Sequence, residues 1–295
     1  MRNMQKLISE ELLPYLQGPG QYVGLETNAR CKDVTTAEVT VAMGFPDAYT
    51  IGISHLGSQV LYCVLNDLPY VACDRTYCPL PDAEQEMRRR DIPLFGWESR
   101  CALGDFDVLG FSLSYELCVT NVLTMLDLAG IPLLSADRTA ANPIIVGGDA
   151  LADSPEPMAE FFDVFIPGDG EEPLVALVEL LRKLKPAGAT RAETLLEIAR
   201  TVPSAYVPRF YEPQYDAEGE FAGLKRLRDD VPETILRARL KKLTDFPALT
   251  APLVPLFEGV HERVMIEIMR GCPNACRFCQ AAHLRRPVRR RSVEE

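Results

Sequence analysis

The chain contains no run of about 18 apolar residues, so no membrane-spanning helix is predicted. Its first residues, MRNMQKLISEELLPYLQG, mix acids into an amphipathic helical pattern and lack the continuous apolar stretch of a secretory signal. Six of the nine cysteines have no spacing typical of a disulfide-rich secreted domain: Cys31, Cys63, Cys73, Cys78, Cys101 and Cys118. These absences favour a cytoplasmic protein that does not bind membranes.

Basic charge is also scarce, with 31 lysines and arginines against 42 acids, and a net charge of −11 gives no indication of nucleic-acid binding. The exception lies near the C-terminus, where five arginines gather: Arg285, Arg286, Arg289, Arg290 and Arg291. Such a run could grip a phosphate or an anionic substrate. We expect instead a solvated or intramolecularly paired charge run, and we assign it no role.

Three further cysteines stand close together in the run RGCPNACRFC, as Cys272, Cys276 and Cys279. Their CxxxCxxC spacing follows the apolar stretch VMIEIM, which is typical of a buried strand. A tight loop can present three thiolates to three irons of a four-iron four-sulfur cluster, which leaves one iron open to an external ligand. The alternatives are three unremarkable thiols or a zinc knuckle, for which only His283 is near enough in sequence to be a fourth ligand.

This motif, with the aromatic Phe278 just before its last cysteine, resembles the cluster-binding signature of the radical SAM superfamily. The resemblance implies that the three cysteines hold a 4Fe-4S cluster whose open iron chelates S-adenosylmethionine, and that Phe278 packs near the adenine. It further implies reductive cleavage of S-adenosylmethionine to a 5'-deoxyadenosyl radical. An electron donor such as a flavodoxin or ferredoxin is then an expected partner, whereas the substrate is not indicated.

Only 16 residues follow Cys279, although a barrel that encloses a cluster and its substrate needs about 200 residues. We therefore expect residues 258–295 to be the incomplete start of a radical SAM domain, truncated after a first strand near residues 263–269 and the cluster loop. This length of chain alone is expected to be inactive.

Residues 41–187 alternate short apolar runs with helical stretches, which predicts an α/β fold with a doubly wound, flavodoxin-like parallel sheet. The expected strands are AYTIGIS, ending at His55, then LPYVACD, DFDVLGFSLS, NPIIVGG and FFDVFI. The expected helices are SQVLYCVLND, ELCVTNVLTMLDLAG closed by Gly130, SPEPMAEFF, and the stretch that follows GDGEE.

Small residues follow several of these strands, at the edge where ligands of such sheets bind. They let a large flat or phosphorylated ligand approach the backbone, and the amides at a following helix start favour an anionic group. The alternative is that they only make tight strand-to-helix turns. The candidate binding residues are Ser112, Ser114, Gly147, Gly148, Gly168 and Gly170.

Together with the cysteine motif, IVGG and GDGEE resemble the cobalamin-binding domain at the amino end of many radical SAM proteins. FPDAYTIGISHLG, PLFGWESR and RRPVRRRS resemble an uncharacterised bacterial family of such proteins. The likeness makes cobalamin a candidate cofactor. It departs at His55, because domains that ligate cobalt through histidine carry DxHxxG, and this chain has neither that aspartate nor that glycine. We expect His55 to cap the next helix or fill a polar pocket rather than to ligate cobalt.

Four segments are expected. Residues 1–40 form an N-terminal lead segment, 41–187 the cobalamin-binding-like domain, 188–257 a linker subdomain, and 258–295 the barrel start. The linker subdomain should contain a helix, ATRAETLLEIAR, and a hairpin around the turn DAEGE, followed by a proline-punctuated extended stretch.

The first functional hypothesis is the N-terminal part of a radical SAM enzyme, with cobalamin-dependent methyl transfer or rearrangement as candidate reactions. One alternative is a non-catalytic module that senses a corrinoid or a nucleotide. Another is a methylthio-transferring tRNA-modifying enzyme. It is disfavoured because those enzymes normally carry a second cysteine set in the N-terminal domain, and the six scattered cysteines make no obvious one.

Overall fold

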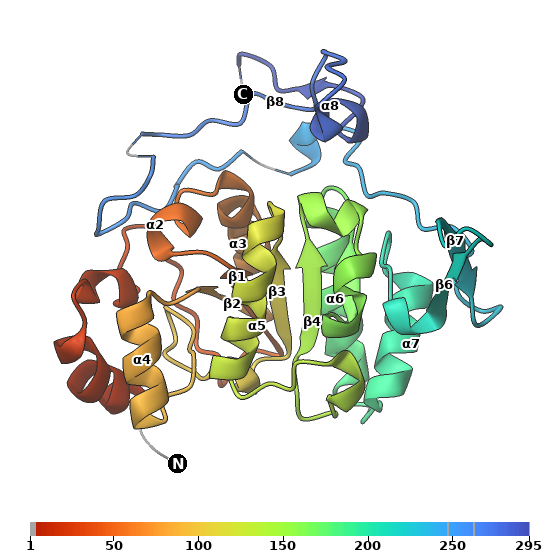
Figure 1. The fold of residues 1–295 in the computed structure, drawn as a ribbon. Helices are drawn as coiled ribbons and strands as arrows, with labels where there is room; N and C mark the ends of the chain where they lie inside the picture. The colour runs from red at the N-terminus through yellow and green to blue at the C-terminus, as the bar shows by residue number, and fades with distance from the viewer. Residues whose placement is uncertain (1–3, 247, 262, 295) are drawn as a thin grey trace.

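A five-stranded parallel sheet forms the centre of the protein in the computed structural model, which describes residues 4–246, 248–261 and 263–294. The strands are β1 (Val39–Phe45), β2 (Val71–Tyr77), β3 (Val108–Ser112), β4 (Ile144–Gly148) and β5 (Val164–Ile166). Their spatial order is β2-β1-β3-β4-β5, and each neighbouring pair is parallel (Figure 1). This is the flavodoxin-like order, so the predicted α/β fold class is confirmed.

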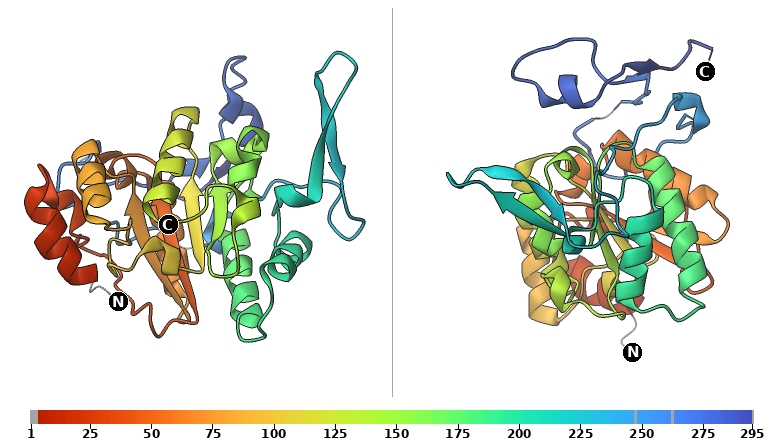
Figure 2. Two further views of the ribbon diagram at one scale, coloured as in Figure 1. Left: turned by 60° about the horizontal axis from the view of Figure 1, so that its bottom comes forward. Right: turned by 90° about the vertical axis from the view of Figure 1, so that its right-hand side faces the viewer.

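Helices cover both faces of the sheet, which explains why its strands are almost entirely buried. Helix α3 (Leu56–Asp67) packs against α6 (Glu171–Leu184) on one face, and α4 (Pro81–Arg90) packs against α5 (Val119–Leu128) on the other (Figures 1 and 2). Gly130, with a φ of 66°, ends the α5 region as predicted.

The first strand lies earlier than the sequence predicted. Residues 48–54 were expected to be extended, but Tyr49–Gly52 forms the short helix α2, and the strand is the preceding run VTVAMGF. Pro46 follows that strand, and the carboxylate of Asp47 accepts a hydrogen bond from the amide of Ala48 at 2.7 Å, which turns the chain into α2. The β-branched residues of YTIGIS misled the sequence interpretation, because the turn at Pro46 and Asp47 leads them into a helical turn despite their strand propensity. The other four predicted strands are confirmed.

The remaining elements are short. The predicted helix after Ser154 is instead the 3-10 helix Glu156–Phe161, and the helix in the linker region is α7 (Arg191–Thr201), which begins with a capping box between Thr190 and Glu193. Helix α1 (Met4–Lys6) continues into a π-helical segment, Leu7–Leu12. Other 3-10 turns are Leu13–Tyr15, Pro19–Tyr22, Leu103–Asp105, Glu116–Cys118, Ser135–Asp137, Ala150–Asp153, Pro208–Phe210 and Leu243–Asp245.

The linker region contains the predicted hairpin, β6 (Tyr211–Tyr215) paired with β7 (Phe221–Arg226). It projects from the side of the α/β body, as Figure 2 shows. Before and after it the chain runs along the sheet edge. Phe165 of β5 pairs with Tyr206, and Gly168 pairs with Ala238.

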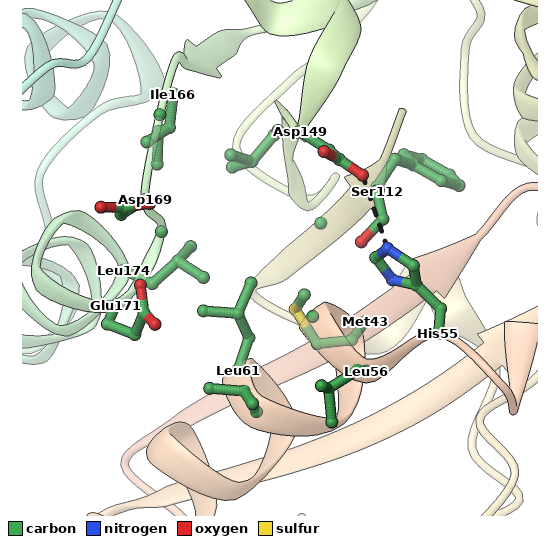
Figure 3. A pocket seen from close by; sticks show the side chains of 18 of the residues that line it. Met43, His55, Leu56, Leu61, Ser112, Asp149, Ile166, Asp169, Glu171 and Leu174 are labelled. Atoms are coloured by element: carbon green, nitrogen blue, oxygen red, sulfur yellow. Dashed lines mark ion pairs between the residues drawn. The ribbon is translucent and has the colours of Figure 1, made fainter. Parts of the chain in front are cut away.

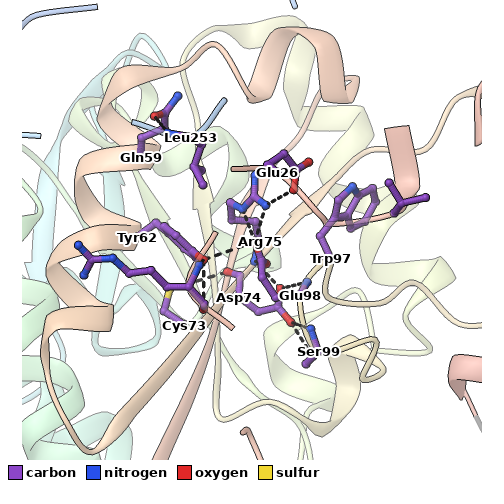
Figure 4. A network of polar contacts seen from close by, with 12 residues as sticks. Glu26, Gln59, Tyr62, Cys73, Asp74, Arg75, Trp97, Glu98, Ser99 and Leu253 are labelled. Carbon is purple, nitrogen blue, oxygen red and sulfur yellow. Dashed lines mark hydrogen bonds and ion pairs between the residues drawn. The ribbon is translucent and has the colours of Figure 1, made fainter. Parts of the chain in front are cut away.

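A buried ionic network ties the N-terminal segment to β2 (Figure 4). Arg75 contacts the carboxylates of Glu26, at 2.8 Å, and Glu98, while Asp74 accepts hydrogen bonds from the amides of Glu98 and Ser99. The side chains of Arg75, Glu26 and Glu98 are each at most 5% exposed. Residues 1–40 are therefore part of the same folded body as the sheet, in their described portion.

The C-terminal residues form only short elements, β8 (Met269–Arg270), α8 (Gln280–Leu284) and β9 (Arg289–Arg290), with β8 antiparallel to β9. The predicted strand over residues 263–269 is wrong except at its end. Val264, Ile266 and Ile268 are exposed. Within the described chain, β8 pairs with β9, and this pairing begins only at Met269, so the residues before it have no partner strand. Among the described residues, no helix is long and apolar enough to cross a membrane.

Candidate functional site

A cavity of about 260 Å³ lies at the carboxyl edge of the sheet, where α/β sheets of this order bind ligands (Figure 3). Its floor is apolar and comes from the ends of β1, β3, β4 and β5 and from helices α3 and α6. The floor residues are Met43, Val60, Leu61, Gly110, Phe111, Val146, Ile166 and Leu174. Such a floor suits a flat apolar group, with polar side chains left to orient it.

His55 lies at the rim of this cavity and is the N-cap of α3. Its Nδ1 accepts a hydrogen bond from the amide of Ser58 at 3.2 Å and lies 2.8 Å from the Ser58 hydroxyl. The predicted capping role is thus realised, in place of the more usual serine, threonine or aspartate. Its Nε2 faces Asp149 Oδ2 at 3.6 Å (Figure 3).

Burial lowers the pKa of His55 below its usual value; Arg285 acts in the same direction, while Asp149 opposes both. The cap geometry agrees, because Nδ1 can accept from the Ser58 amide only when it carries no proton, and the positive end of the α3 dipole disfavours an imidazolium. His55 is therefore a neutral imidazole at neutral pH, with Nε2–H directed toward Asp149.

The two predicted serines join this polar rim. The Ser112 hydroxyl is 3.0 Å from that of Ser58, and the Ser114 hydroxyl donates to Asp149 Oδ2 at 2.7 Å. Ser112 lines the cavity directly, whereas Ser114 acts through Asp149. Asp149 itself has a φ of 72° and a ψ of −153°, a backbone conformation that is costly for any residue other than glycine. Such strain is typical of functional sites.

The four predicted glycines have different surroundings. Gly148, Gly168 and Gly170 line the cavity, but Gly147 lies beneath it, where an added Cβ would come within 2.8 Å of Phe165 and 2.9 Å of Leu113. Gly168 has a φ of 105°, and its Cβ would lie 2.1 Å from the carbonyl oxygen of Ala238. Gly147 and Gly168 are thus required by packing and turn geometry, whereas a Cβ on Gly148 would meet only two carbonyl oxygens, at 3.9 and 4.0 Å.

Acidic side chains occupy the start of α6, where we expected the helix amides to favour an anionic ligand. Glu171 is 2% exposed and lines the cavity together with Asp169. Glu171 Oε1 pairs with Arg270 Nη2 at 2.5 Å, but its buried Oε2 has no hydrogen-bond partner among the described residues. A ligand that offers an N–H or O–H group suits this edge better than a phosphate does.

The roof of the cavity is a segment that we call the C-terminal strap, residues 267–289. Glu267, Arg270 and Arg285 of the strap line the cavity, and Arg289 pairs with Asp169. Burial would raise the pKa of Asp169, but the Arg289 guanidinium and the Leu240 amide hold it below its usual value. The arginine run is thus largely paired within the molecule, as predicted, and sequence reasoning missed that two of its members cover the cavity and its rim.

The three motif cysteines lie on the strap. Cys276 is exposed and Cys272 and Cys279 are half-buried, all three as free thiols. Phe278 is 92% exposed and packs against no cofactor pocket in this conformation. Within the part of the chain that the structure describes, no three His, Cys, Asp or Glu side chains are grouped to hold a metal ion. The donor set still fits a cluster, because three free thiols share one loop whose base is closed by the β8–β9 pair.

Comparison with known proteins gives a family match and distant structural likenesses. The sequence matches a family described as radical SAM proteins, N-terminal, over residues 57–208, just over half of the chain. The uncharacterized protein MJ0966 of Methanocaldococcus jannaschii is 26% identical over 261 residues, which cover 86% of this chain and 44% of that protein. The chain thus spans less than half the length of this curated relative.

Two solved structures of the cobalamin-dependent S-adenosylmethionine radical enzyme OxsB are also similar. The structure with aqua-cobalamin bound has a TM-score of 0.50, and the one with aqua-cobalamin and S-adenosylmethionine bound has 0.49. Each is 17% identical to this chain and covers 87% of it, while the chain covers 30% of each. At this identity the likeness extends to the fold alone.

Proposed function

Since the chain belongs to the family described as the N-terminal region of radical SAM proteins, we propose that it is the corrinoid-binding part and the cluster loop of an enzyme that reductively cleaves S-adenosylmethionine. The observation that carries this proposal is that the cavity at the sheet edge lies directly against the segment that bears the three cysteines. Methyl transfer or rearrangement of an unidentified substrate is the proposed outcome. The activity is a proposal for the whole protein, because the chain spans less than half the length of the curated relative.

A 4Fe-4S cluster held by Cys272, Cys276 and Cys279 would supply the electron that cleaves S-adenosylmethionine to a 5'-deoxyadenosyl radical. Three free thiols on one loop support this assignment. We propose that Phe278 packs against the adenine once the loop is ordered around its cofactors; its present exposure leaves that face available. A flavodoxin or ferredoxin in the cytoplasm is the proposed electron donor.

The sheet-edge cavity is the proposed corrinoid site. A corrinoid presents carboxamide groups, and the buried Glu171 Oε2 is an acceptor without a partner in the described chain. The cavity is partly open to solvent, so its apolar floor suits a flat ring of the ligand with the rest above the edge. Ser112, Gly148, Gly168 and Gly170 would contact the ligand, with Ser114 and Gly147 supporting them.

His55 is not proposed as a cobalt ligand. Its Nδ1 accepts from the Ser58 amide and its Nε2 faces Asp149. Binding of cobalt by Nδ1 would therefore break the helix cap, and binding by Nε2 would break the contact with the Asp149 carboxylate. A metal-bound histidine normally has one nitrogen on the metal and the other on an orienting carboxylate or carbonyl, an arrangement that this ring does not adopt. The proposed domain limits are 41–187 for the corrinoid-binding domain, whose first strand begins two residues earlier at Val39, 188–257 for the linker and 258–295 for the barrel start.

Anaerobic reconstitution with iron and sulfide tests the cluster assignment. Visible charge-transfer absorption should appear with the wild-type chain and be lost in each of Cys272→Ala, Cys276→Ala and Cys279→Ala, because a site with three protein ligands has none to spare. Cys101→Ala, on the α/β body, is the matched control and should keep the absorption. Retention of the full signal by all three motif variants would refute the assignment.

Equilibrium titration with hydroxocobalamin tests the corrinoid site. We expect saturable binding to the wild-type chain, unchanged in His55→Ala and weakened in Glu171→Ala. Circular dichroism must show that both variants fold. Loss of binding on His55→Ala alone would mean that the histidine is a cobalt ligand after all, and no binding to any folded form would refute the corrinoid assignment.

A further inference from the structure

The C-terminal strap is fastened to the rim of the cavity by ion pairs at both ends of the cysteine loop. Before the loop, Arg270 pairs with Glu171 at 2.5 Å and with Asp169 at 3.4 Å. After the loop, Arg285 pairs with Asp149 at 2.9 Å, and Arg289 pairs with Asp169. Figures 1 and 2 show the strap running across the carboxyl edge of the sheet.

The pairs that Arg270 makes are not ordinary surface salt bridges. The Glu171 and Asp169 side chains are 2% and 6% exposed, and that of Arg270 is 18% exposed. Breaking the ion pairs of a partly buried guanidinium costs free energy, because the charges then stay buried without partners. These contacts therefore fix the strap more firmly than exposed pairs do.

The base of the cysteine loop is a single unit. Met269 pairs with Arg290 and Arg270 with Arg289, which brings the two ends of the loop together. Gly271 has a φ of 90°, and a Cβ there would lie 2.3 Å from the carbonyl oxygen of Arg285. The two ends of the loop, which carry the rim arginines, are therefore held side by side.

The same arginines also line the cavity. The cavity is partly open to solvent, and Arg270 and Arg285 lie across its polar rim while they hold Glu171 and Asp149. The acids on the ends of β4 and β5 therefore serve two roles. They line the cavity, and they bind the strap.

We propose that the C-terminal strap is an electrostatic latch over the cavity, through which ligand entry and the position of the cysteine loop are coupled. Entry requires the Arg270 and Arg285 pairs to open, and the loop lifts with them. The ligand named here, a corrinoid, rests on the proposed function, whereas the latch rests on the ion pairs alone.

The latch is tested on the full chain by hydrogen exchange of the backbone amides over residues 271–285. Arg270→Gln with Arg285→Gln should increase exchange severalfold across this segment and leave the sheet amides unchanged. Arg209→Gln with Arg263→Gln removes the same charge from two exposed positions outside the strap and should exchange like wild type. High salt should accelerate exchange of the segment in wild type more than in the latch variant. Equal exchange in all three proteins would overturn the proposal.

Ligand coupling is tested by the rate at which hydroxocobalamin associates, followed by its visible absorption. The latch variant should associate and dissociate severalfold faster than both wild type and the charge-matched control. Unchanged rates with altered exchange would overturn the coupling. Binding to none of the three proteins would refute the corrinoid ligand and with it the coupling, while the exchange result would still decide whether the latch exists.

Discussion

The imidazole of His55 lies against the carboxylate of Asp149, with Nε2 and Oδ2 3.6 Å apart. The two residues come from different loops, one at the start of α3 and the other after β4. Asp149 also holds Arg285 of the strap and accepts from Ser114. This carboxylate therefore connects a helix cap, a cavity rim and the segment that carries the cysteines.

Replacing His55 tests the cap. His55→Ala removes the acceptor for the Ser58 amide and should lower the free energy of unfolding by about 1 kcal/mol, whereas His55→Asn, which restores a capping acceptor, should lose much less. Urea denaturation measures both. Equal losses in the two variants would show that cavity-rim packing, and not the cap, accounts for the contribution of His55.

The lowered pKa of His55 makes stability depend on pH. The folded pKa lies below the unfolded value of 6.5, so the unfolded chain binds more protons between the two. The contribution is complete above the unfolded pKa and is lost as the pH falls through the folded pKa. The charged groups that face the ring are Asp149 and Arg285.

We expect wild type to lose more unfolding free energy than His55→Asn between about pH 7.5 and about pH 5. His261→Asn, at an exposed histidine, is the control and should follow wild type. Parallel pH profiles for wild type and His55→Asn would mean that the histidine titrates normally in the fold.

The buried network around Arg75 makes a strong prediction about stability. Burial alone would lower the pKa of Arg75, but the carboxylate of Glu98 holds it well above its usual value. Arg75→Met leaves Glu26 and Glu98 buried without their cation and should cost about 3 to 5 kcal/mol. Arg88→Met, which breaks the exposed pairs with Glu84 and Asp127, should cost less than about 1 kcal/mol.

Adding Glu26→Gln and Glu98→Gln to Arg75→Met removes the orphaned charges. The triple variant should therefore regain part of the lost stability in thermal unfolding. A single Arg75→Met variant as stable as wild type would show that these acids already bind protons in the fold.

The sequence predicted those parts of the molecule whose signals are local. Four strands were found as apolar runs buried on both faces, and the capping of α3 by His55 was anticipated. The sequence places the first strand too late, because the β-branched residues after Asp47 outweigh the strand-ending signal of Pro46 and Asp47. The pairing of Asp149 with Arg285 had no local signal, since an acid after a strand and an arginine in a charged run pair only through the tertiary fold. The strained backbone conformation of Asp149 likewise has no signal in the local sequence.

Two adjacent glycines at the end of β4, Gly147 and Gly148, allow the effect of an added methyl group on packing to be measured apart from its effect on ligand binding. Gly147→Ala places a methyl group within 3 Å of Phe165 and Leu113 and should destabilise the fold by about 1 to 3 kcal/mol. Gly148→Ala meets nothing closer than 3.9 Å, so its stability should equal or slightly exceed that of wild type. Because Gly148 lines the cavity, its methyl group should nevertheless weaken hydroxocobalamin binding.

Chemical denaturation and cobalamin titration of this pair decide the role of the strand-end glycines. A folded Gly148→Ala protein with reduced affinity means that the bare backbone is there for the ligand to approach. A folded Gly148→Ala protein with wild-type affinity would mean that Gly148 serves the turn alone, because a methyl group added at the cavity without disturbing the fold would then have no effect on what the cavity binds.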